Sequence, residues 1–303
     1  ELVKDYVRYD KDFRRVTLID RTEINPSGLT VEELGNFVLE QFAVEKQILV
    51  IVNTKACARN LYLYLKEYSE REGDLFHLST NMCALNRKEV LDSLKLCLET
   101  ENPAKPVICV STQLIEAGVD LSFRCVIRSL AGLDNIIQAA GRCNRHGKWA
   151  NGNVYIVKMS DEAEHVSRLT EIKTAQAAME EILRCYREAP ETVGRDLLSA
   201  KAKEQYYLRY LRDQTRQTEF CVNVHGADTT LVELLSENEI ARHQYRRHMG
   251  KPLKCMMKQS FKTAGEKFEV ISEEGKMNVV VEYSKDVVSM LEELQDPYIL
   301  YGR

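Results

Sequence analysis

Short runs of consecutive apolar residues, each followed by a stretch with helical spacing, constrain the fold of this chain more than any other feature. Residues 48–52 (Ile-Leu-Val-Ile-Val) and 107–110 (Val-Ile-Cys-Val) contain no charged or amide side chain. An unbroken apolar run of this length is typical of a strand buried on both faces of a parallel sheet. Because parallel neighbours need long crossovers, helices are predicted between them. The first half therefore predicts an α/β fold, a RecA-like doubly wound parallel sheet.

The other elements continue this alternation. Capping-box spacing at Thr30 and Glu33 predicts a helix that extends to about Phe42. Ser160 is predicted to begin another helix, which ends before Pro190. Further strands are predicted at 16–19, 125–127 and 154–157, and further helices around 58–65, 90–98 and 199–212.

A change of character after the last of these strands predicts three segments. The first, 1–160, is the α/β domain, and the second, 161–248, is a helical linker region. The third, 249–303, is predicted to be a small α+β domain that holds a strand pair at 267–271 and 278–282.

Cysteine and histidine usage argues against a metal site. The nine cysteines are scattered, with no two closer than 12 positions, and the six histidines show no ligand spacing. Scattered thiols fit a reducing compartment, so we expect a cytoplasmic protein. The longest aliphatic stretch, 48–52, is too short to cross a bilayer, and no membrane partner is expected.

The formal net charge of −4 argues against attraction of nucleic acid over the whole surface. Its distribution is uneven, because residues 242–262 contain seven Lys or Arg and no acidic residue. Such a run is compatible with a solvated basic face and with a local contact to phosphates.

A run of eight residues, Gln-Ala-Ala-Gly-Arg-Cys-Asn-Arg from Gln138 to Arg145, has charged side chains at helical spacing. Gln138, Arg142 and Arg145 stand at i, i+4 and i+7, which predicts one face of a helix that also contains Gly141. Two arginines near the carboxyl edge of an α/β sheet suit a triphosphate, because cations stabilise the transferred group. Spacing alone equally allows a surface pair bonded to carboxylates.

Polar residues follow two of the predicted buried strands. Asn53 and Thr54 come after the strand at 48–52, and Ser111 and Thr112 come after 107–110. Ligands of parallel sheets bind at the carboxyl ends of the strands. Hydroxyls and backbone N–H groups at this edge can hold phosphate oxygens.

The segment from Ser111 to Asp120 (Ser-Thr-Gln-Leu-Ile-Glu-Ala-Gly-Val-Asp) and the run from Gln138 to Arg145 together resemble motifs V and VI of superfamily 2 helicases. Within the first, Gly118 permits a tight turn and Asp120 offers a carboxylate that can accept a hydrogen bond from a ribose hydroxyl.

A more specific resemblance covers both halves of the chain. Residues 48–54, 111–120 and 128–147 are similar to the second RecA-like domain of the CRISPR-associated helicase-nuclease of type I systems. Residues 259–265 (Gln-Ser-Phe-Lys-Thr-Ala-Gly) resemble the C-terminal domain of that family, most closely of subtype I-C.

This resemblance implies roles for individual residues. Arg145 would be the arginine finger that reaches the γ-phosphate, with Arg142 beside it and Gln138 positioning the phosphate or water. Gly118, Asp120 and Gly141 would line the nucleotide. The residues implied to grip the phosphates of a translocating DNA strand are Asn53, Thr54, Arg87, Ser111 and Thr112.

The sequence does not contain G-x-x-x-x-G-K-[ST], the phosphate loop of this enzyme class. It also has no Asp-Glu pair after a buried strand to hold Mg²⁺. The resemblance implies that ATP and Mg²⁺ are held mainly by a preceding first domain. We therefore expect no cofactor in this chain and no ATP hydrolysis by it alone, and its start at Glu1 fits part of a longer protein.

The expected function is that of the C-terminal part of an ATP-dependent single-stranded DNA translocase or helicase in CRISPR interference. The implied partners are single-stranded DNA and a Cascade-type surveillance complex. One alternative is part of a DEAH-type RNA helicase, against which residues 259–265 count. The other is a RecA-like module that binds nucleic acid or a partner without catalysis.

Overall fold

The structure is a computed structural model that describes residues 14–68, 73–99, 106–116, 118–212, 220–254, 257–268, 277 and 279–295. The chain divides into two compact units, residues 1–207 with 281–303, and residues 208–280. These units are not the three segments expected from the sequence, whose boundaries stay a prediction.

A parallel sheet forms the first unit. Its strands are β1 (Val16–Asp20), β2 (Gln47–Ile51), β3 (Asp74–Leu78), β4 (Val107–Ser111), β5 (Cys125–Ser129) and β6 (Gly152–Val157). They lie in the order β1-β6-β5-β2-β4-β3, and every pairing is parallel. All residues of β2, β4 and β5 are buried, which confirms the inference from the apolar runs. The edge strand β3 was not predicted, because four of its five residues are only half-buried.

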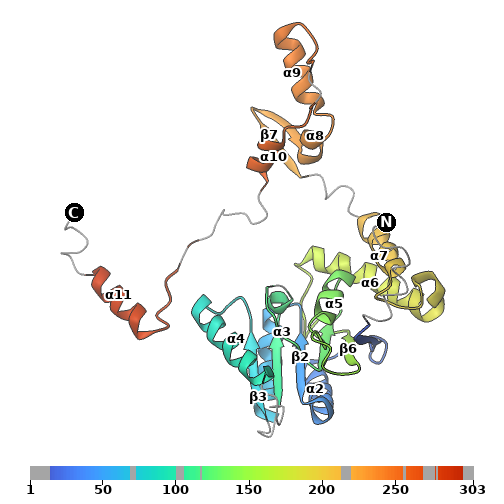
Figure 1. Ribbon diagram of the computed structural model, residues 1–303, viewed down its shortest axis with the longest axis vertical. Coiled ribbons are helices and arrows are strands. Elements are labelled where there is room, and N and C mark those ends of the chain that lie inside the picture. The colour runs from blue at the N-terminus through green and yellow to red at the C-terminus, as the bar shows by residue number, and fades with distance from the viewer. Residues whose placement is uncertain are drawn as a thin grey trace. The chain divides into compact units, whose positions relative to one another are not determined.

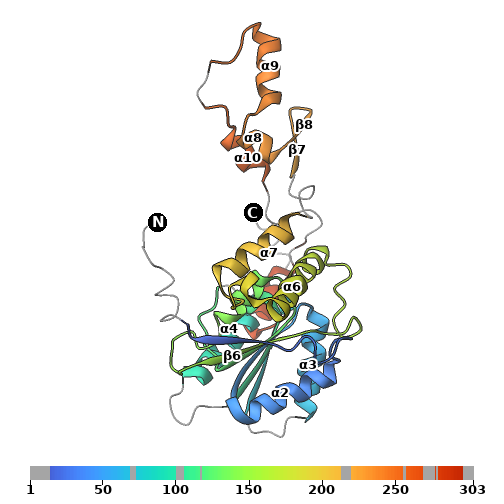
Figure 2. The same cartoon turned by 90° about the vertical axis from the view of Figure 1, so that its right-hand side faces the viewer.

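Helices cover both faces of this sheet (Figure 1). They are α2 (Val31–Glu45), α3 (Lys55–Tyr68), α4 (Ala84–Glu99) and α5 (Leu133–Ala140). Apolar residues of α2 and α3 share one core cluster with alternate residues of β2, β4 and β5, and Figure 2 shows these helices side by side. The chain then reverses its direction across the sheet, so right-handed crossovers place α4 and α5 on the other face. The doubly wound fold is confirmed.

Local signals for two helix starts have different outcomes. Thr30 caps α2 in a complete capping box, since its hydroxyl accepts from the N–H of Glu33 and its own N–H donates to that carboxylate. Ser160, in contrast, caps a turn, with its hydroxyl accepting from the N–H of Ala163. The helix expected there is α6 (Thr170–Glu188), which begins ten residues later, and α7 (Ala200–Arg212) follows it.

The second unit is small and α+β. It contains the antiparallel hairpin β7 (Cys221–Val224) and β8 (Ala227–Thr230), then α8 (Leu231–Leu235), α9 (Glu239–Met249) and α10 (Phe261–Lys267). Its core cluster consists of Val222, Leu231, Leu234 and Ala264.

The strand pair expected at 267–271 and 278–282 is not found where it can be examined. Lys267 belongs to α10, and 279–282 form no strand. The rest of both segments lies outside the described residues. The last described element, α11 (Lys285–Gln295), belongs to the first unit. None of the helices in the described part of the chain combines the length and apolar character that a bilayer crossing requires.

Candidate functional site

The polar residues at the ends of β2 and β4 lie together, as expected. The two strands are neighbours, with Ile51 opposite Ser111, so Asn53 and Thr112 follow at the same edge. Thr54 stands directly before α3, and its hydroxyl accepts from the N–H of Cys57 at 3.2 Å. We call Asn53, Thr54, Ser111 and Thr112 the strand-end cluster.

Most side chains of this cluster are committed to internal contacts. Asn53, Ser111 and Thr112 are buried, and the Ser111 hydroxyl donates to the Thr112 carbonyl at 2.9 Å. Thr54 is half-buried. Contacts to a ligand at this edge would therefore come from Thr54 and from backbone groups, with Asn53 and Ser111 supporting them from beneath.

Beneath the cluster lies a buried network that joins Asn53, Glu116, Arg128, Ser129 and Glu164. The Arg128 side chain is 0% exposed, and its Nε donates to Glu116 Oε1 at 2.9 Å. Its Nη1 donates to Asn53 Oδ1 at 2.8 Å. The Asn53 amide donates in turn to Ser129 Oγ and Glu164 Oε2, both at 2.8 Å. The ends of β2 and β5 are thus tied to the segments that follow β4 and β6.

Glu116 is the acidic partner of Arg128 in this network. Burial raises the pKa of its carboxyl group, and the neighbouring Arg128 guanidinium opposes that rise. Asn135 of α5 donates to its second oxygen at 2.9 Å. Sequence reasoning assigned no role to Glu116, Arg128 or Glu164. The available signal was an arginine inside an apolar strand, because a buried charge requires a partner.

Arg87 lies on α4, the helix that follows β3, and β3 pairs with β4. Its Nη2 donates to the carbonyl of Met82 at 3.2 Å, and its Nε is buried without a hydrogen-bond partner among the described residues. Because α4 begins after the carboxyl end of β3, Arg87 in its first turn lies at the same edge of the sheet as the strand-end cluster.

The expected helical face of Gln138, Arg142 and Arg145 does not exist. Helix α5 ends at Ala140, and Gly141 caps it with an N–H that donates to Ile137 O. The residues that follow, 141–149, form a loop that we call the arginine loop. Local spacing failed here because contacts with the segment before β5 end the helix within the motif.

The expected position at the carboxyl edge is also wrong for Arg145, whereas the Arg142 side chain reaches the carbonyls of Ile115 and Glu116, which follow β4. The N–H of Asn144 donates to Phe123 O at 2.8 Å, and the N–H of Arg145 donates to Ser122 Oγ at 3.0 Å. Both acceptors precede β5, so this loop lies at the amino ends of the strands. The strand-end cluster and the arginine loop occupy opposite ends of the sheet.

The two arginines have different environments. Arg142 is 7% exposed, and its guanidinium donates to the carbonyls of Ile115 at 2.9 Å and Glu116 at 2.6 Å. The Arg145 side chain is 42% exposed, and its Nε donates to Asp120 Oδ1 at 2.7 Å. That hydrogen bond lowers the pKa of Asp120. Arg142 therefore pins a neighbouring segment, whereas Arg145 is accessible.

Asn144 and Arg15, to which sequence reasoning gave no role, hold the arginine loop. Asn144 has a φ of 44° and donates through Nδ2 to Arg15 O at 3.0 Å and Trp149 O at 2.8 Å. Arg15 Nη1 donates to Arg145 O at 2.6 Å. Arg14, Arg15, Arg145 and Lys203 also line a hollow of about 420 Å³, together with Asp196 and several uncharged residues. The hydrogen bonds of Asn144 and Arg15 hold the backbone of the arginine loop, and so they fix the point from which the Arg145 side chain projects.

The remaining candidates lie at the surface of this region. Gln138 is exposed on α5, and Gly141 is exposed directly after it. Gly118 is exposed and has a φ of 74°, which is consistent with the expected tight turn. The Asp120 carboxylate also lies 3.9 Å from His146 Nε2.

The strand-end cluster and the arginine loop both lie in or beside a segment that matches a known protein family. Residues 44–148 match the family described as CRISPR-associated nuclease/helicase Cas3, C-terminal. This segment is therefore similar to the C-terminal domain of Cas3. It contains the strand-end cluster and nearly all of the arginine loop.

Two curated Cas3 proteins are similar in sequence to parts of this chain. The CRISPR-associated nuclease/helicase Cas3 of Haloferax volcanii is 51% identical over 61 residues, which are 20% of this chain and 6% of that protein. The Methanothermobacter thermautotrophicus Cas3 is 26% identical over 162 residues, 53% of this chain and 18% of that protein. The chain thus matches less than a fifth of either relative.

Among solved structures, the crystal structure of T. fusca Cas3 matches with 19% sequence identity and a TM-score of 0.49. The alignment covers 67% of this chain and 25% of that one. The match to subtype I-C that the sequence favoured stays a prediction.

Proposed function

We propose that this chain supplies the arginine finger and one strand grip of an ATP-dependent single-stranded DNA translocase or helicase in CRISPR interference. The phosphate loop and the Mg²⁺ ligands would come from another domain of the same protein, because the sequence does not contain G-x-x-x-x-G-K-[ST]. By itself the chain would not hydrolyse ATP.

The observation that carries the proposal is the environment of Arg145. The residue is exposed, its backbone is held by Arg15, and its guanidinium rests on an exposed carboxylate, that of Asp120. An exposed ion pair is worth only about 0–1 kcal/mol. Arg145 can therefore exchange this carboxylate for a γ-phosphate at little cost, which a finger must do in each cycle.

The strand grip would use the carboxyl edge of the sheet. Thr54 and backbone N–H groups would contact phosphates, with Arg87 supplying a cation, and such contacts fix a strand without reading its bases. The buried network would keep this edge rigid through Asn53, whose amide nitrogen has three acceptors within 2.9 Å. A Cascade-type surveillance complex and a cytoplasmic location belong to the proposal through the Cas3 family match.

The proposal predicts the effect of removing the finger. In the full-length protein, Arg145→Ala should lower DNA-stimulated ATP turnover by about 10³-fold or more, because the charge of the transition state loses its cation. Nucleotide affinity should stay within a few fold. Steady-state ATPase rates with single-stranded DNA, and binding of a fluorescent ATP analogue, measure the two quantities.

Arg195→Ala is the matched control. Arg195 is also exposed and forms an ion pair, with Glu191, but it lies outside the arginine loop. Its turnover should remain near that of the wild type. Turnover of Arg145→Ala equal to that of this control would rule out the finger.

A non-catalytic binding module remains the second candidate, and one observation favours it. Hydrogen bonds to the carbonyls of Ile115 and Glu116 give Arg142 a structural role, so the presence of this arginine does not require hydrolysis. Single-strand binding by a full-length protein without DNA-stimulated ATPase would support the module.

A further inference from the structure

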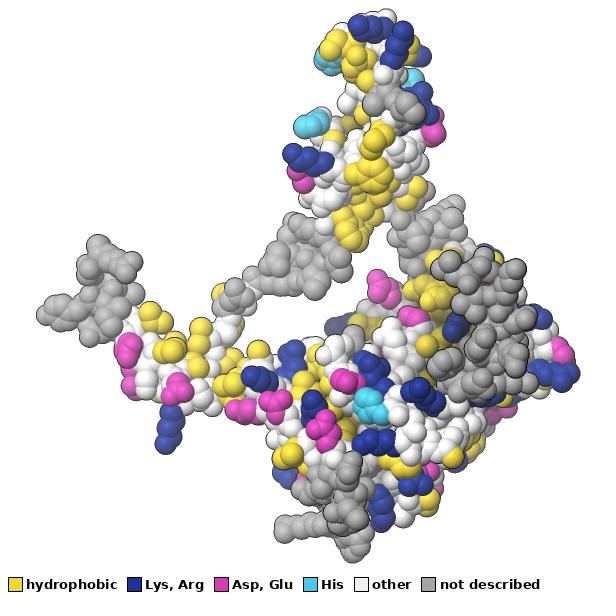
Figure 3. Space-filling model, in the orientation of Figure 1, with side chains coloured by type: hydrophobic (Ala, Val, Ile, Leu, Met, Phe, Trp, Pro, Cys, Tyr) yellow, Lys and Arg dark blue, Asp and Glu magenta, His cyan; other side chains and the backbone are white. Residues whose placement is uncertain are grey.

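Helix α9 is an exposed element whose surface is mainly cationic. None of its eleven residues is buried, and its last turn carries Arg246, Arg247 and His248. Figure 3 shows Lys and Arg side chains gathered over this helix. Packing of an apolar face stabilises most protein helices of this length. Since α9 buries no such face, its cationic surface is available for a partner.

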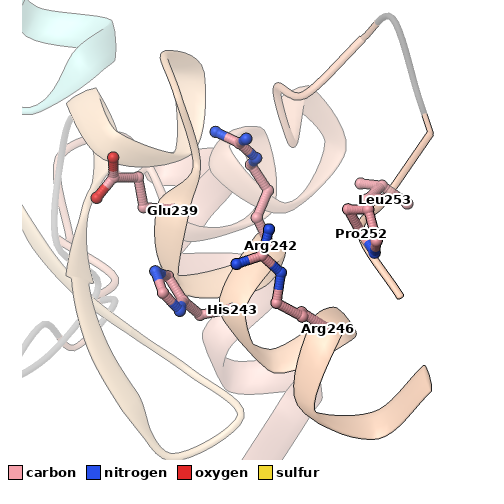
Figure 4. Close-up of a pocket in the computed structure, with 6 residues that line it drawn as sticks. All are labelled: Glu239, Arg242, His243, Arg246, Pro252 and Leu253. Carbon is pink, nitrogen blue, oxygen red and sulfur yellow. The ribbon is translucent and has the colours of Figure 1, made fainter. Parts of the chain in front are cut away.

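Local contacts hold α9 at both ends. At its start, Asn238 is buried and donates through Nδ2 to Lys258 O at 2.9 Å and Ser260 Oγ at 2.7 Å. At its end, Gly250 adopts a φ of 67°, and its N–H donates to Arg246 O at 2.9 Å. This left-handed turn brings the chain back, so that Pro252 and Leu253 face the helix across a small hollow (Figure 4).

Two guanidinium groups line this hollow. Figure 4 shows Arg242 and Arg246 projecting from the same side of α9, with His243 and Glu239 also at the rim. Arg242 lies 3.3 Å from Glu237, a carboxylate that Lys258 shares at 2.8 Å. Among the described residues, neither Arg246 nor Arg247 has an ion-pair partner. Like charges one helical turn apart destabilise a helix, so an anion between them would be favourable.

We propose that Arg242 and Arg246 form a contact site for the phosphodiester backbone of single-stranded DNA. Guanidinium groups hold phosphate oxygens through two parallel hydrogen bonds. Lys251 and Lys254 follow after the turn, so the cations continue as a track along the chain. A track suits a polyanion with regularly spaced charges better than a single carboxylate. This inference rests on the proposed single-strand function and adds a contact outside the Cas3-like segment.

The test is the salt dependence of binding. The full 303-residue chain is titrated onto a dye-labelled 30-nucleotide oligo-dT, by fluorescence anisotropy, between about 50 and 200 mM NaCl. Each lost phosphate contact makes the plot of log affinity against log salt shallower by about 0.7. R242Q/R246Q should therefore make it shallower by about 1.4 and weaken binding most at low salt. R242K/R246K should keep the slope and lose affinity only a few fold.

R59Q/K66Q removes the same charge from the exposed side of α3 and should leave the slope unchanged. Circular dichroism and thermal melting of each variant verify that it is folded. A slope for R242Q/R246Q equal to that of this control overturns the α9 site.

Arg87→Gln separates the two proposals. If only Arg87→Gln weakens binding, the strand-end grip stands and the α9 site fails. If only R242Q/R246Q weakens it, the α9 site stands without that grip. Failure of the wild-type chain to bind oligo-dT at 50 mM NaCl, about the lowest salt used, overturns both.

Discussion

The run from Gln138 to Arg145 contains two arginines whose side chains have different environments. Three residues after Arg142, which is buried against backbone carbonyls, Arg145 is exposed on Asp120. Spacing alone does not reveal which guanidinium the neighbouring segment binds, and only the resemblance to the helicase family distinguished Arg145 from Arg142. Arg128 was overlooked for a related reason. Its partner Glu116 lies on a separate segment, and the two residues meet only because the sheet places β4 and β5 on either side of β2.

At the residue scale, the buried pair should control stability. Arg128→Ala leaves the Glu116 carboxylate buried without its cation, which costs about 3–5 kcal/mol of unfolding free energy. Urea unfolding of the chain, monitored by circular dichroism, measures the loss.

Arg195→Ala again provides the comparison, because it breaks the pair with Glu191, in which both side chains are more than half exposed and which is worth about 0–1 kcal/mol. Equal losses for the two variants would mean that the network around Arg128 adds nothing to stability.

At the element scale, the sequence predicted strands better than helix ends. The fully buried β2, β4 and β5 have a distinct apolar pattern, whereas the mixed β3 does not. Helix α2 was predictable because a capping box is a local interaction. The end of α5 was not, since it depends on hydrogen bonds from Asn144 and Arg145 to residues that precede β5.

The capping box gives a prediction at this scale. Thr30→Ala removes the acceptor for the N–H of Glu33 and should lower the unfolding free energy by about 0.5–2 kcal/mol. Thr174→Ala makes the same substitution on an exposed part of α6, where alanine is the better helix former. Its unfolding free energy, measured in the same urea titration, should be equal to that of the wild type or higher. Indistinguishable midpoints for the two variants would contradict a role of Thr30 in stability.

At the scale of the whole molecule, the two compact units have separate cores. That of the smaller unit centres on Leu234, which packs with Val222, Leu231 and Ala264. The sequence predicted three segments instead. A change from alternating to helical spacing marks where the pattern changes, but it does not reveal which helices pack against the sheet. Helix α7, for example, places Tyr206 within 3.4 Å of Asp134 on α5.

Because their cores are separate, we expect a core substitution in one unit to leave the stability of the other unit unchanged. Leu234→Ala should cost about 2–5 kcal/mol in the smaller unit. Its amides, those of β8 and α8 first, should exchange faster with deuterium, while those of β2 and β4 keep their protection. Leu235→Ala, at an exposed neighbouring position, is the control and should change neither set. Faster exchange in β2 and β4 would show that the units unfold as one.

The placement of the arginine loop and the strand-end cluster at opposite ends of the sheet has a mechanical consequence. The five residues of β4 span about 16 Å at 3.3 Å per residue. A close-packed sheet does not shorten or bend easily over such a length. In the proposed motor, this sheet would act as a rigid body, so a displacement imposed on Arg145 at one end would also move Thr54 at the other. Neither group would then need to change shape, and rotation of the domain as one body would be enough.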